Sequence, residues 1–131
     1  MKPKYYLAVA AYCAFIFWLS NQSDPPHPKI GFPQMDKVAH AVLFGGLASL
    51  VSLGLHRSGR PHRPAIYHLA PVLTALLYGI FDECHQYFVP PRTPDVFDVM
   101  ADVTGAFLAQ EILRKWFRRR PVNPLPLPEE T

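Results

Sequence analysis

Four apolar blocks divide this chain and set its fold class. They cover residues 5–19, 38–55, 65–81 and 96–113, and none alternates apolar and polar residues as a strand would. Each is close to the roughly 17 to 25 residues that a membrane-spanning helix needs. Half of the 131 residues are hydrophobic, which would also suit one soluble domain, but their grouping into long blocks would not. The sequence therefore predicts an all-α integral membrane bundle of four transmembrane helices.

The first block needs a separate test, because a short apolar run after Lys2 and Lys4 is also typical of a secretory signal peptide. A signal peptide would end in a cleavage site with small residues, and the aromatic residues that lead into Ser20 provide none. We therefore expect this block to be retained as the first helix.

The positive charges indicate the orientation. Ten of the thirteen Lys and Arg residues lie at the amino terminus, in the second connector or at the carboxyl-terminal edge: Lys2, Lys4, Arg57, Arg60, Arg63, Arg114, Lys115, Arg118, Arg119 and Arg120. The positive-inside rule then places both termini in the cytoplasm and the connectors 20–34 and 86–94 outside. The basic balance is thus a topology signal, and no nucleic acid is expected as a partner.

One domain accounts for the chain. Residues 1–120 hold all four blocks, whereas 121–131 contain four prolines and two glutamates and are predicted to be a disordered tail. Cys13 and Cys84 fall at different depths of the predicted bundle, so no disulfide is expected between them.

Acidic residues are concentrated at the ends of the blocks that this topology places outside. Carboxylates cost roughly 2.5 to 3.5 kcal/mol each at the centre of a membrane helix, so they are normally kept for a polar site. Seven of the ten acidic residues belong to this set: Asp24, Asp36, Asp82, Glu83, Asp95, Asp98 and Asp102. The sequence therefore predicts a polar chamber toward the outer membrane face.

Helical spacing groups these side chains on faces. Asp36 and His40 are four residues apart and lie one above the other. Asp82, His85 and Gln86 share a face, with Glu83 expected to point elsewhere. In the fourth block the acids continue into small residues, which allow close helix contact in lipid, so this stripe is expected to face inward: Asp95, Asp98, Asp102, Gly105 and Ala109.

Neutral and cationic groups complete the chamber, and a simpler role is open for some of the acids. Ser20, Gln22, Lys37 and Arg92 fall at the same membrane level. Asp95 and Asp36 also precede apolar runs, where Asp is favoured as an amino-terminal helix cap. The residue types suit acid–base chemistry, metal binding or anion recognition, and they do not choose among these.

Several segments resemble one family in order and spacing. They are Asp36-Lys-Val-Ala-His40, Asp82-Glu-Cys-His-Gln86, Arg92-Thr-Pro-Asp-Val-Phe-Asp98 and Ala-Asp102-Val-Thr-Gly105. With them the chain resembles the VanZ-like family of small bacterial membrane proteins, over about residues 20–109. Cys84, in place of an aliphatic residue, and Pro90-Pro91, in place of Pro-Gly, depart from the family pattern without removing a polar residue.

The resemblance implies a multi-pass protein of the bacterial cytoplasmic membrane. The family's named member is linked to low-level resistance to the lipoglycopeptide teicoplanin. The partners implied are the lipid bilayer and a lipid-linked envelope substrate or a lipoglycopeptide.

Two hypotheses follow. The first is an enzyme that acts on a lipid-linked envelope molecule at the outer leaflet, where crowded carboxylates and a histidine relay move protons. Its catalytic candidates are His40, Asp82, Glu83, His85, Asp98 and Asp102. Its substrate-binding candidates are Ser20, Gln22, Asp36, Lys37, Gln86 and Arg92.

The second hypothesis is a non-enzymatic pocket that binds a lipid or an antibiotic, or that stabilises a complex. In that case Lys37 and Arg92 would neutralise the acids in buried pairs. A metal-assisted enzyme is a variant of the first hypothesis, but the sequence has no diagnostic ligand spacing and names neither a metal nor another cofactor. A transporter is less favoured, since four short helices without a repeat leave little room for alternating access.

Overall fold

The computed structural model describes residues 1–22, 34–58 and 63–118, and these residues form four α-helices and no strand. The helices are α1 (Pro3–Ser20), α2 (Met35–His56), α3 (Pro64–Gln86) and α4 (Val96–Arg118). The all-α prediction is confirmed, and each apolar block lies within one helix. Asp24 and the tail 121–131 lie outside the described residues.

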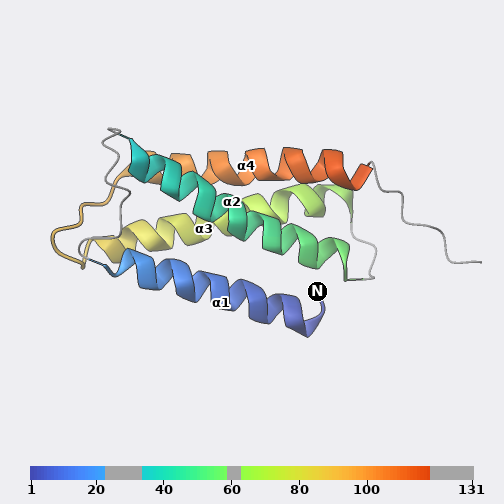
Figure 1. The fold of residues 1–131 in the computed structure, drawn as a ribbon, viewed down its shortest axis with the longest axis horizontal. Coiled ribbons are helices and arrows are strands. Elements are labelled where there is room, and N and C mark those ends of the chain that lie inside the picture. Colours follow the sequence, from blue (N-terminus) through green and yellow to red (C-terminus); the bar gives the residue numbers. More distant parts are fainter. Residues whose placement is uncertain (23–33, 59–62, 119–131) are drawn as a thin grey trace, which may run out of the picture.

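The helices run alternately up and down, so that two helix starts and two helix ends meet at each end of the bundle (Figure 1). One end, here called the acidic end, collects the ends of α1 and α3 and the starts of α2 and α4 (Figure 1). The amino terminus lies at the other end (Figure 1). This end also holds Lys2, Lys4, Arg57 and Arg63 and is here called the basic end. Every predicted site residue therefore lies at the acidic end, because each belongs to one of these four helix ends or to a connector that joins two of them.

Local sequence explains most helix boundaries. Prolines open α1 and α3, where a missing backbone N–H costs nothing. Asp95 caps α4, since its Oδ1 accepts the backbone N–H of Phe97 at 2.8 Å, which confirms the cap expected there. The cap expected at Asp36 is wrong: Asp36 lies inside α2, Gln34 occupies the cap position, and no side chain makes a capping bond there.

The tightest helix contact joins α2 to α4, and α1 packs against α2 and α3. At Gly105 of α4 a Cβ atom would overlap the carbonyl oxygen of Ala41, and at Gly45 of α2 a Cβ would lie 3.1 Å from the carbonyl oxygen of Gly105. The two backbones thus approach each other directly. This agrees with the inward-facing stripe of small residues expected on α4.

The distribution of polarity is inverted relative to a soluble domain. The apolar core is small and centres on Ile16, Phe44 and Leu47. Nine polar or charged residues are buried among those that the structure describes, while large apolar side chains lie exposed on all four helices. Such an apolar exterior marks a surface that is covered by a membrane or a partner.

Of the described helices, α2 and α3 are long and apolar enough to cross a membrane. Four spans and cytoplasmic termini stay predictions.

The contact at Gly105 gives a test of the fold. Gly105→Ala would force α2 and α4 apart, and overpacking of this kind costs about 1–3 kcal/mol. This loss should exceed the gain of about 1 kcal/mol that alanine brings to a helix interior. We expect a lower Tm for the purified protein in detergent.

Gly46→Ala is the matched control, because its Cβ would meet only the end of the Tyr12 side chain, which can move. Equal or higher Tm values for both variants would contradict the α2–α4 contact.

Candidate functional site

Carboxyl groups from α2, α3, α4 and the connector before α4 surround one point at the acidic end. Four of them, Asp82, Glu83, Asp98 and Asp102, are buried, with exposed fractions of 2%, 6%, 4% and 0%. Burying a charged carboxylate is costly unless it is paired or hydrogen-bonded. The partners of each carboxyl group therefore decide whether the cost of its burial is offset.

His40 and Asp102 form the deepest pair. The Nδ1 atom of His40 lies 3.0 Å from Oδ1 of Asp102, and both side chains are buried. With Asp102 ionised, Nδ1 carries a hydrogen and donates it, and the other ring nitrogen, Nε2, then has a lone pair in the neutral imidazole and a hydrogen in the protonated one. Phe44, one helical turn after His40, stacks on the imidazole with its ring plane tilted by only 4°. The ring is thus fixed in orientation from two sides.

A glycine makes room for this pair. A Cβ at Gly79 of α3 would lie 2.5 Å from Oδ2 of Asp102, so the carboxylate can rest against α3 only because residue 79 has no side chain. This Oδ2 atom has no hydrogen-bond partner among the described residues. Gly79 was not predicted from the sequence, where its signal is a glycine one turn before Asp82.

Lys37 neutralises two of the acids. Its Nζ atom lies 2.6 Å from Oδ2 of Asp95 and 2.8 Å from Oδ1 of Asp98. The ammonium group, together with the N–H of Phe97, lowers the pKa of Asp95 below its usual value. Lys37 thereby ties the start of α2 to the start of α4.

Gln86 orients the two acids of α3. Its Nε2 atom donates to Oδ2 of Asp82 at 3.1 Å and to Oε1 of Glu83 at 3.3 Å. Oε2 of Glu83 accepts the backbone N–H of Asp95 at 2.7 Å. Oδ1 of Asp82 has no partner in the part of the chain that the structure describes. One buried oxygen of this group therefore remains available to a ligand.

A pocket of about 110 Å³ opens beside these residues. Its polar lining comes from α1, α2, α3 and the connector after α3: Ser20, Asp36, His40, Asp82, Gln86 and Arg92. Ser20 Oγ, like Asp82 Oδ1, is buried without a partner among the described residues. Arg92 is positioned by its Nε atom, which donates to the backbone oxygen of Gln22 at 3.2 Å. The pocket thus combines a basic nitrogen, an unpaired carboxylate oxygen and a guanidinium group.

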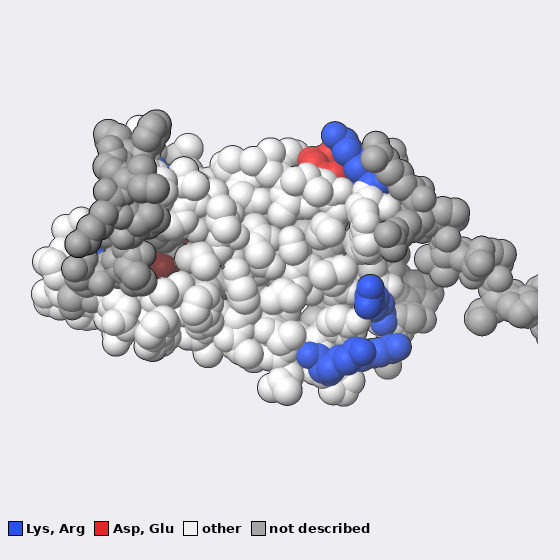
Figure 2. All heavy atoms as spheres, in the orientation of Figure 1, with Lys and Arg blue, Asp and Glu red and all other residues white. Residues whose placement is uncertain are grey.

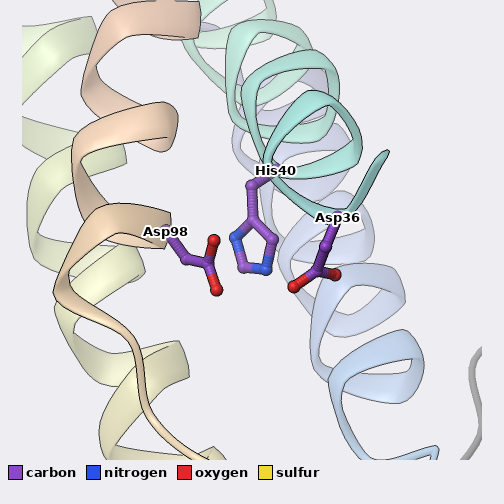
Figure 3. A group of neighbouring side chains, drawn as sticks. All are labelled: Asp36, His40 and Asp98. Atoms are coloured by element: carbon purple, nitrogen blue, oxygen red, sulfur yellow. The ribbon is translucent and has the colours of Figure 1, made fainter. Parts of the chain in front are cut away.

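Two groups of side chains could hold a metal ion, and both contain His40. In one, the carboxylates of Asp36 and Asp98 point toward the His40 ring from opposite sides (Figure 3). In the other, His40 meets Asp82 and Glu83. Within each group the ligand atoms lie within 4.8 Å of one another, so the donors converge as metal ligation requires.

Comparison with known proteins identifies the family of this chain. The family model described as VanZ/LLP1 matches residues 5–117, which include the whole pocket lining. The chain belongs to the VanZ/LLP1 family. This confirms the resemblance drawn from the sequence motifs. No curated protein and no solved structure matches the chain.

The structure brings most of the predicted residues of this VanZ/LLP1 protein together, but it reverses two side chains of α3. Glu83, expected to point away, joins Asp82 and His40. His85, expected beside Asp82, instead packs on the Phe17 ring of α1 with ring centroids 4.3 Å apart, and it does not line the pocket.

The reason is the rotation of α3 about its axis. At about 100° per residue, Gln86 lies about 40° from Asp82, about 60° from Glu83 and about 100° from His85. The inward face is centred near Gln86, so Glu83 falls inside it and His85 outside. Gln22 also differs from expectation, since its side chain donates to the backbone oxygen of Trp18 and the residue approaches the pocket through its own backbone oxygen.

The Lys37 pairs give a stability test. In Lys37→Met, Asp98 would remain buried with no cation, and an unsatisfied buried group costs about 1–3 kcal/mol or more when charged. We expect a clear fall in Tm in detergent, and substantial recovery in the double variant Lys37→Met/Asp98→Asn, where the buried charge is removed as well.

Asp95→Asn is the control, since its side chain is 38% exposed and exposed pairs contribute little. A double variant as unstable as Lys37→Met would show that Lys37 does not act by neutralising Asp98.

Proposed function

We propose that this VanZ/LLP1 protein is a multi-pass protein of the bacterial cytoplasmic membrane, with four spans, both termini in the cytoplasm and the pocket open toward the outer face. Large apolar side chains are exposed on α1 and α4 as well as on the two more apolar helices, among them Leu7, Phe15, Phe107, Leu108 and Ile112. These surfaces support burial of all four helices in lipid.

The charge distribution supports the orientation. Lys2, Lys4, Arg57, Arg63 and Arg114 belong to the basic end, and on the face drawn in Figure 2 the described residues between the two ends are uncharged. Positive charge at one end and an uncharged middle fit a cytoplasmic edge and a lipid-covered belt.

Labelling of cysteines in intact cells tests this topology. In a chain with Cys13→Ser and Cys84→Ser, we expect a membrane-impermeant maleimide to modify Thr93→Cys in intact cells. Arg57→Cys should be modified only after the membrane is permeabilised. Residues 93 and 57 are both exposed in the structure, so the fold itself shields neither cysteine from the maleimide. Modification of the two sites in the opposite order would overturn the orientation.

We further propose that the pocket carries out acid–base chemistry on a lipid-linked molecule of the cell envelope. The observation that carries this proposal is the buried His40–Asp102 pair, which engages Nδ1 and leaves Nε2 to accept or donate a proton at the pocket. Asp82, with one unpaired buried oxygen, supplies a second titratable group beside it. Two such groups in one low-dielectric site can divide the roles of acid and base.

The surroundings of the pocket suit a substrate with a charged head and an apolar tail. Arg92 lines the pocket and offers a guanidinium group of the kind that binds phosphate. A groove of about 670 Å³ at the end of α3 and the start of α4 is lined mainly by apolar side chains, including Tyr87, Phe88 and Val99, and reaches Glu83 and Asp95. An acyl or prenyl chain in this groove would place its head group near the acids.

The experiment is teicoplanin susceptibility of a sensitive Gram-positive host that expresses the wild-type chain, Asp102→Asn or His40→Gln at matched membrane levels. We expect protection by the wild-type chain and its loss in both variants, together with a change in the lipid extract that mass spectrometry detects only with the wild type. Glu111→Gln, at the basic end, should protect like the wild type.

Protection by neither the wild type nor the variants would remove the resistance role from this protein. Protection by all of them would favour the second candidate, a pocket that binds a lipid or an antibiotic without changing it. The Lys37 contacts with Asp95 and Asp98 favour that candidate, because they neutralise acids that a reaction would otherwise use.

A further inference from the structure

We propose that His40, Asp82 and Glu83 bind a divalent transition-metal ion, Zn²⁺ or Mn²⁺, at the inner wall of the pocket. The proposal rests on the same pocket as the proposed function and deepens it. With the ion in place, His40 Nε2 would be a metal ligand, and a water molecule on the ion would take over the role of the base.

The three residues come from facing positions on α2 and α3, and their ligand atoms lie within 4.8 Å of one another. Their exposed fractions are 7%, 2% and 6%. An ion at this position would be enclosed by protein on one side and would face the pocket on the other, because His40 and Asp82 both line the pocket. This leaves a position for water or substrate, as catalytic metal sites require.

His40 is prepared for ligation by Asp102. Metal-binding histidines commonly donate one ring N–H to a carboxylate, which fixes the tautomer and makes the other nitrogen a better ligand. The Nδ1 contact with Asp102 at 3.0 Å provides this arrangement. Among the described residues the hydrogen-bond partner of the ring is Asp102, at Nδ1, so in the neutral imidazole the Nε2 lone pair is left for the ion.

Asp82 provides an independent indication of a ligand. Its side chain is almost fully buried, yet Oδ1 has no hydrogen-bond partner among the described residues. A buried carboxylate oxygen without a partner is expensive, and an ion would remove that cost. Gln86 holds Oδ2 of Asp82 and Oε1 of Glu83, which fixes both carboxylates in orientation.

The charges of the site also call for a cation. Six carboxyl groups at the acidic end face two permanent cations among the described residues: Asp36, Asp82, Glu83, Asp95, Asp98 and Asp102 against Lys37 and Arg92. Lys37 is committed to Asp95 and Asp98, and Arg92 donates to a backbone oxygen. Within the described part of the chain, Asp82 and Glu83 therefore have no permanent cation at hydrogen-bonding distance, and a divalent ion would compensate both.

The alternative group in Figure 3 is less suitable. Asp98 is already paired with Lys37 at 2.8 Å, and Asp36 is exposed to solvent. The chemistry of the favoured group, one imidazole nitrogen and two carboxylates, suits zinc or manganese better than magnesium, which prefers oxygen ligands and retained water.

The test uses the purified full chain in detergent, stripped with a chelator and then titrated with Zn²⁺ and with Mn²⁺. We expect about one bound ion per chain by elemental analysis, saturable binding by calorimetry and a rise in Tm on binding. Asp82→Asn and His40→Gln should lose this binding. Asp102→Asn, a change at a positioning residue, should weaken it about 10- to 100-fold. Asp36→Asn and Glu111→Gln should bind like the wild type.

Asp82→Asn also separates loss of binding from loss of fold. Without metal this variant lacks the uncompensated buried charge, so its Tm should equal or exceed that of the stripped wild type, while added metal should no longer raise it. Manganese electron paramagnetic resonance should change from the bound to the aqueous signal in the same variant.

Absence of a stoichiometric ion in the wild type with both metals would overturn the proposal. So would binding that survives Asp82→Asn but is lost in Asp36→Asn and Asp98→Asn, since that result would assign the ion to the other group. These measurements need no substrate. Metal binding without teicoplanin protection would therefore refute the resistance role alone, and protection without metal binding would refute the ion site alone.

Discussion

The hydrogen bond between His40 and Asp102 links the two helices on which the rest of the acidic end depends. It forms because α2 and α4 approach closely at Ala41 and Gly105, immediately beside it, and because Gly79 leaves space for the carboxylate on α3. A side chain at either glycine would displace the helix or the acid. Small residues thus place an ionisable pair in the interior of an otherwise apolar bundle.

The remaining acids are arranged around this pair in two ways. Those of α4 near its start are compensated by Lys37, which bridges Asp95 and Asp98. Those of α3 are oriented by the neutral Gln86 and have no permanent cation as a partner among the described residues. The first arrangement stabilises the helix ends, whereas the second leaves uncompensated charge at a pocket. The cost of that charge is the physical basis of the metal site proposed on the α3 side of the pocket.

The α4 side of the site was predictable from the sequence, and the α3 side was not. Block lengths and the cap at Asp95 predicted the four helices, and the spacing on α4 predicted its inward stripe. The face of α3 was not predictable in this way, because offsets of three and four residues place neighbours on both sides of Asp82. Whether Glu83 or His85 turns inward depends on how α3 packs, and the stacking of His85 on Phe17 of α1 shows the outcome.

The sequence by itself determined the helices, the collection of carboxyl groups at one end and of basic residues at the other, and membership of the VanZ/LLP1 family. These properties follow from local composition and from the order of segments along the chain. Only the tertiary structure decided that His40 meets Asp102, 62 residues away, that Lys37 pairs with Asp95 and Asp98, and that Asp82 keeps an unpaired oxygen. Such pairings depend on the rotation and close approach of different helices, which the periodicity of any single helix does not specify.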